Sequence, residues 1–139
     1  MPVSLTPVFT VVVPLYNTER YIARTLESVR TQSFGDFEVI IVDDGSSDSG
    51  PALVEAMMID DARIRMVRQP NRGLAGARNT GIRHARGKYL AFLDADDLWL
   101  PRKLEAHRAQ LDADPTIGLA YAPSLFIDQD DKALGFGQT

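Results

Sequence analysis

The segment YLAFLDADDLW runs from mostly apolar residues directly into three carboxylates. Asp94, Asp96 and Asp97 follow the hydrophobic run 89–93. Asp94 and Asp96 are two residues apart, so in an extended segment their side chains point the same way, and carboxylate oxygens suit Mg²⁺ or Mn²⁺. With so few protein ligands, Mg²⁺ fills its other positions with water and phosphate oxygens. The segment therefore predicts a metal site at Asp96 and Asp94 with a phosphate-bearing ligand. An acidic turn without a ligand is the alternative.

Two further segments carry polar groups suited to a nucleotide. In DDGSSD, Asp44 lies beside Gly45 and could accept hydrogen bonds from a base or ribose, while Asp43 is expected to brace the turn. In PLYNTER, Tyr16 could stack on a base or lie at the edge of the core. Glu19 in the same segment is either part of the site or a first-turn helix acid favoured by the macrodipole.

Short apolar runs alternate with helical patterns along the chain. The runs 9–14, 37–42, 64–67 and 89–93 are rich in β-branched and aromatic residues and mostly do not alternate, which is typical of strands buried on both faces. Helices are expected from about 22 to 29, from Pro51 onward, from about 74 to 85 and from about 104 to 111. Asn17 or Thr18 could cap the first of these helices.

The pattern predicts an α/β fold with a largely parallel sheet and helices on both faces, of the Rossmann-like kind. The apolar segment 117–128 is expected to add a fifth strand. All strands of a parallel sheet open their carboxyl ends on one edge, where ligands bind. Four polar loops must then share this edge: PLYNTER, DDGSSDSG, RQPNRGLAGARN and DADDLW.

Composition narrows the class of protein. With 139 residues, 45% hydrophobic and 24% charged, residues 1–139 are expected to form a single domain. The net charge is −4 and the basic residues are spread along the chain, which argues against nucleic-acid binding. The absence of cysteine fits a reducing compartment, and the N-terminal apolar run is too short to span a bilayer. We expect a cytoplasmic protein, or one at the cytoplasmic face of a membrane in its full-length form.

The segments VVVPLYNTERYIARTLESVRTQSFGDFEVIIVDDGSSDSG and NRGLAGARNTGIRHARGKYLAFLDADD resemble the nucleotide-sugar-binding half of family 2 glycosyltransferases of the GT-A fold. The resemblance extends from about Phe9 to about Asp128, and four motifs in order make it specific. It implies a site in which Pro14 and Tyr16 lie along the nucleotide, Asn17 and Glu19 fit the YNxE pattern, Asp44 binds the base, Arg78 and Asn79 lie beside the diphosphate, Asp96 binds the metal, and Asp94 lies near the ribose or metal. Asp97 is expected to cap the segment that follows it.

By the same resemblance, the reaction is transfer of a sugar from a nucleoside diphosphate sugar, with a UDP-sugar favoured, to an acceptor hydroxyl. The transfer would be metal-dependent, with Mg²⁺ or Mn²⁺, and would invert the anomeric carbon. The acceptor, whether saccharide, lipid or protein, is left open. Family members carry the catalytic base in a second half, so the base is expected beyond Thr139. This chain is then expected to be a truncated donor-binding part with little activity alone, and to self-associate through an uncovered sheet edge near residues 119–126.

Two other classes share some of these features. A receiver-like signalling module also places paired acids after one strand and another aspartate after a later strand. Against it, the strand 9–14 precedes the acidic pair, and IGLAYAPS lacks the lysine that should end a later strand. A DxD phosphatase has a threonine or valine after its motif, whereas Leu98 stands here. Both remain as alternatives to the glycosyltransferase.

Overall fold

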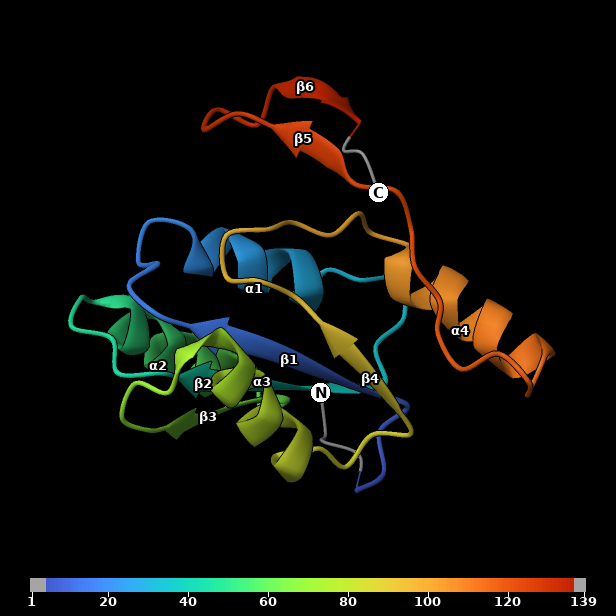
Figure 1. Cartoon of the computed structure of the whole chain (residues 1–139), viewed down its shortest axis with the longest axis horizontal. Helices are drawn as coiled ribbons and strands as arrows, with labels where there is room; N and C mark the ends of the chain where they lie inside the picture. The colour runs from blue at the N-terminus through green and yellow to red at the C-terminus, as the bar shows by residue number, and fades with distance from the viewer. Residues whose placement is uncertain (1–4, 137–139) are drawn as a thin grey trace. The chain divides into compact units, whose positions relative to one another are not determined.

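The computed structural model describes residues 5–136, which form two compact units, one up to Lys103 and one from Leu104 onward. Strands and helices alternate along the first unit (Figure 1). Its elements are β1 (Phe9–Leu15), α1 (Ile22–Arg30), β2 (Phe37–Asp43), α2 (Gly50–Asp60), β3 (Ile64–Arg68), α3 (Gly73–His84) and β4 (Tyr89–Phe92). They are followed by α4 (Lys103–Ala113), which begins at the division, β5 (Leu125–Ile127) and β6 (Ala133–Phe136).

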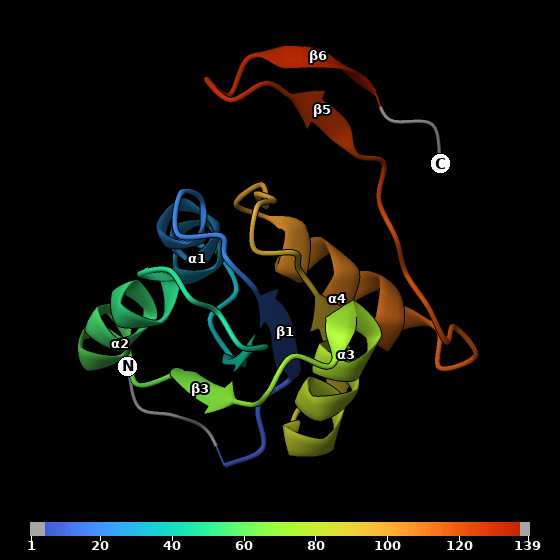
Figure 2. The ribbon, with the colours of Figure 1, turned by 60° about the vertical axis from the view of Figure 1, so that its left-hand side comes forward.

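The first unit is built on a parallel sheet with the strand order β3-β2-β1-β4. Helices α1 and α2 lie on one side of this sheet and α3 lies on the other (Figure 2). The predicted α/β fold with helices on both faces is therefore confirmed. Every residue of the two central strands, β1 and β2, is buried, as their unbroken apolar runs predict. The same expectation is wrong for the two edge strands: in β3 only Ile64 is buried, and on β4 Leu90 and Phe92 are exposed.

Helix α3 packs closely on the centre of the sheet. A Cβ atom added to Gly81 would lie 2.3 Å from Cγ1 of Val12 on β1. Nearby, Ala77 of α3 packs with Ile40 and Val42 of β2 in one buried cluster. The small residues at 77 and 81 let the helix backbone approach the strands. The position of α3 relative to β1 is thereby fixed.

A buried glutamate holds the turn between α3 and β4. Glu38 on β2 is only 2% exposed. Its Oε1 accepts hydrogen bonds from Thr10 Oγ1 and from the backbone N–H of Arg86, both at 2.8 Å, and Oε2 accepts one from Arg65 at 3.3 Å. Thr10 Oγ1 also accepts the backbone N–H of Gly87 at 2.8 Å. These bonds compensate for burying the charge and anchor the start of β4 beside β1.

A second buried ion pair joins the beginning of β3 to that of β2. The guanidinium of Arg63 donates to both carboxylate oxygens of Asp61, at 3.0 and 2.7 Å, and to the carbonyl of Gly35 at 3.1 Å. It also lies 4.2 Å from the ring centroid of Phe37. These hydrogen bonds lower the pKa of Asp61 below its usual value, although burial opposes the shift.

The second unit contains α4, as expected, and a short antiparallel hairpin of β5 and β6. The predicted fifth strand over 117–128 is wrong in length and partner, because only Leu125–Ile127 is a strand and it pairs with β6. Asp128 Oδ1 braces the hairpin turn by accepting the backbone N–H groups of Asp130 and Lys132, at 2.8 and 2.9 Å. Within residues 5–136, the helices fall short of the length and apolar character that crossing a membrane requires.

Candidate functional site

Strands β1 and β4 separate at the carboxyl edge of the sheet. Their last backbone hydrogen bond joins Leu93 N–H to the carbonyl of Val12, at 3.1 Å. Pro14 is the next residue of β1 whose backbone is directed towards β4, and as a proline it has no N–H with which to continue this ladder. Tyr16 follows the end of β1 and is 52% exposed. The loops after β1 and β4 diverge here, which is where open α/β sheets bind their ligands.

The loops after β1 and β2 are fastened to each other. Asn17, which has a φ of 51°, accepts the backbone N–H of Ser47 on its Oδ1 at 2.8 Å. Glu19 Oε2 accepts the backbone N–H of Ser49 at 2.8 Å, and Glu19 N–H in turn donates to Asp48 at 3.0 Å. Asn17 and Glu19, both predicted site residues, thus shape the edge through backbone groups of the neighbouring loop.

These contacts correct two expectations about helix ends. Helix α1 begins at Ile22, and its N-cap, Tyr21, makes no side-chain cap hydrogen bond, so the expected capping by Asn17 or Thr18 is wrong. The Asn17 oxygen is already used by the adjacent loop. Glu19 is also not a first-turn acid of α1; its carboxylate binds the N–H of the residue that precedes α2 instead.

The two adjacent aspartates after β2 have different surroundings. Asp43 Oδ1 accepts the backbone N–H of Ser46 at 3.0 Å, which confirms the prediction that Asp43 braces the turn. Asp44 is 3% exposed. Its Oδ1 accepts hydrogen bonds from Gln69 Nε2 at 2.9 Å and from the backbone N–H of Arg72 at 2.8 Å. Asp44 is therefore tied to the loop after β3.

Helix α3 meets the acidic loop through Arg78. The Arg78 Nη2 atom lies 3.0 Å from Asp94 Oδ1. Within the described part of the chain, Arg78 Nε is buried and has no hydrogen-bond partner. Asn79, the next residue on the helix, is exposed. The structure thus brings together two residues predicted for the site, Arg78 and Asp94.

The three carboxylates share one turn, in which Asp97 N–H donates to the carbonyl of Asp94 at 3.0 Å. Partial desolvation and then the negative charges of Asp96 and Asp94 raise the pKa of Asp97. Helix α4 begins only at Lys103, so the expected capping role of Asp97 is wrong. Crowded hard oxygens fit Mg²⁺ or Mn²⁺. Across residues 5–136, no three or more histidine or acidic side chains are grouped to hold a metal alone, so ligand oxygens would have to complete its shell.

Polar side chains of α1 and of Gln32, just after its end, hold the acidic loop by its backbone. The Thr25 hydroxyl donates to the carbonyl of Ala95 at 2.9 Å, and Gln32 Nε2 donates to that of Leu100 at 2.7 Å. Ser28 Oγ accepts a backbone N–H of the same loop at 3.2 Å. The sequence prediction missed these residues. Thr25 and Ser28 are three residues apart and so share one face of α1, which was the available signal.

Replacing Asp97 with asparagine tests the crowding of the carboxylates. Because the folded pKa of Asp97 is raised, ionising it destabilises the folded protein as the pH rises above the usual aspartate pKa of about 3.8. We therefore expect Asp97→Asn to raise the melting temperature near pH 7 and to have no such effect near pH 3. Thermal melts of both proteins across this range measure the difference. Equal melting temperatures at neutral pH would contradict the expectation.

Comparison with known proteins places the chain in a family. The family model for Glycosyl transferase family 2 matches residues 10–133. GlyG of Streptococcus pneumoniae serotype 4 (strain ATCC BAA-334 / TIGR4), a glycosyltransferase, is 37% identical over 121 residues, covering 84% of this chain and 40% of GlyG. EpsH of Bacillus subtilis (strain 168) is 45% identical over 95 residues, covering 68% of this chain and 27% of EpsH. The chain thus spans less than half the length of these relatives.

Solved structures with a similar fold also point to this family. The mannosyltransferase PcManGT from Pyrobaculum calidifontis, in complex with GDP-Man and Mn²⁺, is 35% identical with a TM-score of 0.73 over 81% of this chain and 34% of that protein. S. aureus TarS residues 1–349, in complex with UDP-GlcNAc, is 33% identical with a TM-score of 0.71 over 76% of this chain and 31% of TarS. Neither the receiver nor the phosphatase alternative finds support. The chain belongs to glycosyl transferase family 2.

Proposed function

We propose that the complete protein transfers a sugar from a nucleoside diphosphate sugar to an acceptor hydroxyl, with inversion and with Mg²⁺ or Mn²⁺, and that the first unit holds the donor. Family membership supports the transferase class. The ligands of the two structural neighbours, UDP-GlcNAc in TarS and GDP-Man with Mn²⁺ in PcManGT, support a nucleotide-sugar donor. We favour a uridine donor.

The observation that carries this proposal is the pairing of Arg78 with Asp94 where β1 and β4 part. A guanidinium offers a planar fork of donors that suits phosphate oxygens. Here one donor atom, Nη2, is 3.0 Å from Asp94, and the buried Nε has no partner among the described residues. A diphosphate would supply acceptors for this arginine and oxygens for a cation held by the neighbouring carboxylates.

In this arrangement Arg78 binds and orients the diphosphate, with Asn79 beside it. Asp96 and Asp94 would hold the divalent cation, which when bound would offset charge that develops on the departing diphosphate. Tyr16 and Asp44 would hold the nucleoside, at a site already shaped by the loop braces at Asn17 and Glu19. A base that deprotonates the acceptor must lie within hydrogen-bond reach of its hydroxyl. We assign none among the described residues.

Isothermal calorimetry tests the proposal directly. UDP, GDP and dTDP are titrated into the protein with Mn²⁺, and again after EDTA treatment. We expect heat of binding with UDP in the presence of Mn²⁺ and loss of this heat with EDTA, because diphosphate oxygens and carboxylates share the cation. No heat with any of the three nucleotides, or heat that EDTA does not change, would overturn the proposal.

A further inference from the structure

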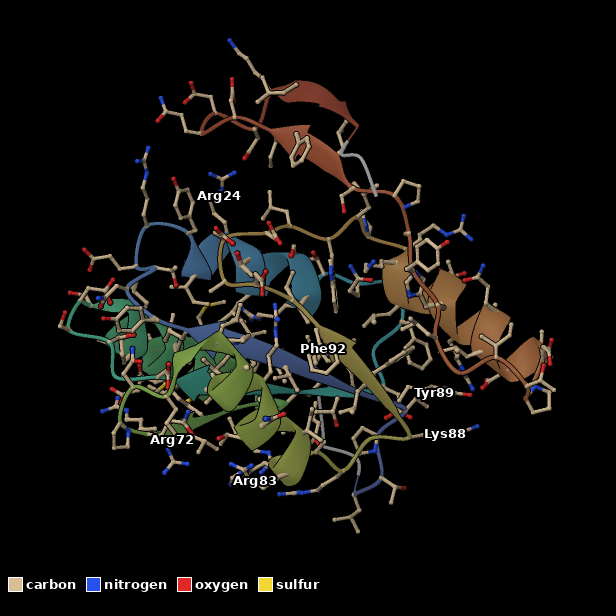
Figure 3. All side chains as sticks on the ribbon, viewed as in Figure 1. Arg24, Arg72, Arg83, Lys88, Tyr89 and Phe92 are labelled. Atoms are coloured by element: carbon tan, nitrogen blue, oxygen red, sulfur yellow. The ribbon has the colours of Figure 1, made fainter. Side chains whose placement is uncertain are left out.

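A chain of hydrogen bonds runs through the protein to Asp44. Arg83 Nη2 lies 3.0 Å from Thr80 Oγ1, Thr80 Oγ1 lies 2.6 Å from Gln69 Oε1, and Gln69 Nε2 lies 2.9 Å from Asp44 Oδ1. Thr80 is buried, on the inner side of α3. Figure 3 labels Arg83, in the last turn of α3, and Arg72, whose backbone N–H also reaches Asp44.

Each hydrogen bond in this series has a defined donor and acceptor. A guanidinium only donates, so the Thr80 oxygen accepts from Arg83 and its own hydrogen is free to go elsewhere. The Gln69 carbonyl is nearer, at 2.6 Å, than the Gly76 carbonyl, at 3.1 Å. With its oxygen facing Thr80, the Gln69 amide turns its NH₂ towards the carboxylate. The opposite orientation would set the amide oxygen against Asp44, two acceptors without a hydrogen between them.

These hydrogen bonds determine which carboxylate oxygen of Asp44 is available to a ligand. Within residues 5–136, both hydrogen bonds to its side chain, from Gln69 and from the Arg72 backbone, end on Oδ1. The carboxylate is thus fixed in rotation, and Oδ2 is the oxygen that remains for a ligand. An ionised carboxylate oxygen only accepts. It therefore matches a ligand group that presents N–H or O–H.

We propose that Gln69 and Thr80 are positioning residues of the nucleobase pocket, which hold Asp44 so that Oδ2 accepts from a base that carries an N–H donor, such as uracil, thymine or guanine. This inference rests on the proposed function. Neither residue needs to touch the nucleotide. Gln69 acts by fixing Asp44, and Thr80 acts by fixing Gln69.

Comparing a ligand that has a base with one that has none distinguishes positioning of Asp44 from a general structural role of Gln69 and Thr80. UDP and inorganic pyrophosphate are each titrated with Mn²⁺ into the unmodified protein and into Gln69→Leu, Thr80→Val and Thr80→Ser. Pyrophosphate has no base, so it reports on the diphosphate and metal side alone. Gln69→Leu and Thr80→Val remove hydrogen bonds while keeping a similar side-chain volume, and Thr80→Ser keeps the hydroxyl. Melting temperatures show that each variant is folded.

We expect Gln69→Leu and Thr80→Val to weaken UDP binding about 10-fold and to leave pyrophosphate binding unchanged. Thr80→Ser should bind both ligands as the unmodified protein does. Because Gln69 is proposed to act through Asp44, the double variant Asp44→Asn/Gln69→Leu should lose less UDP affinity than the product of the two single fold-changes. Unchanged UDP affinity in Gln69→Leu, or an equal loss for both ligands, overturns the inference while the proposed function stands. If the unmodified protein binds neither ligand, both fall.

Discussion

Asp96→Asn is expected to weaken Mn²⁺-dependent nucleotide binding by more than about 100-fold, since even partners outside a metal's first shell contribute 10–100-fold to its affinity. Asparagine keeps the size of the side chain and one oxygen but removes the charge that holds a divalent cation. The free energy of unfolding of the metal-free protein should not fall. Asp96 is exposed, and its charge contributes to the raised pKa of Asp97, so removing it relieves repulsion in the metal-free protein.

Calorimetry with UDP and Mn²⁺ measures the loss of binding, and urea unfolding without metal measures the free energy of unfolding. Asp130→Asn is the matched control, because it removes one exposed acidic charge from the hairpin turn outside the carboxylate turn. The control should bind as the unmodified protein does. An Asp96→Asn protein that is unfolded would mean that the acidic turn has a structural role, and one that binds normally would move the metal elsewhere.

Asp61→Asn is expected to produce the largest loss of stability, about 3 kcal/mol in the free energy of unfolding near neutral pH. The change leaves the Arg63 guanidinium, 8% exposed, without its counter-charge. A buried cation that loses its partner is strongly destabilising, whereas an intact pair is close to neutral overall. Asp60→Asn, at an exposed neighbouring position on the last residue of α2, is the control and should change stability little.

The loss should depend on pH in a defined direction. The folded pKa of Asp61 is lowered, so its ionised form stabilises the fold above the usual aspartate pKa of 3.8, and this contribution disappears as the pH falls through the lower folded value. The gap between the unmodified protein and Asp61→Asn should therefore be largest near neutral pH and shrink below about pH 3.8. Urea unfolding at a series of pH values measures it. A gap that stays constant with pH would rule out the charge as its cause.

Much of the fold was predictable because its signals are local. The unbroken apolar runs of β1 and β2 reflect burial on both faces, and Pro51 stands in the first turn of α2 as its fixed φ favours. The order of polar loops then placed the site at the carboxyl edge, since every strand of a parallel sheet ends there. The structure indeed brings Arg78 to Asp94 at this edge.

Other features were out of reach because they depend on pairing across the chain. A glutamine such as Gln69 reads as a loop residue until Asp44 and Thr80 are placed beside it. The charge of Glu38, within an apolar strand, gives no hint that its partner is the turn before β4. The apolar segment 117–128 predicts a strand but not a partner, and only its part near Ile127 forms one, in a hairpin.

The strand order also means that the two pairings of β1, with β2 and with β4, close chain loops of different length. Phe9 of β1 pairs with Phe37 of β2, 28 residues along, but with Tyr89 of β4, 80 residues along. Closing the longer loop costs about 1 kcal/mol more in chain entropy if the two closures are taken independently. The smallest increment comes when β2 and β3 are already in place, because only the segment from Arg68 to Tyr89 then remains open. The part of the edge that carries Asp44 is thus less costly in chain entropy to assemble, and the part that carries Asp94 and Asp96 is added at the lowest cost after it.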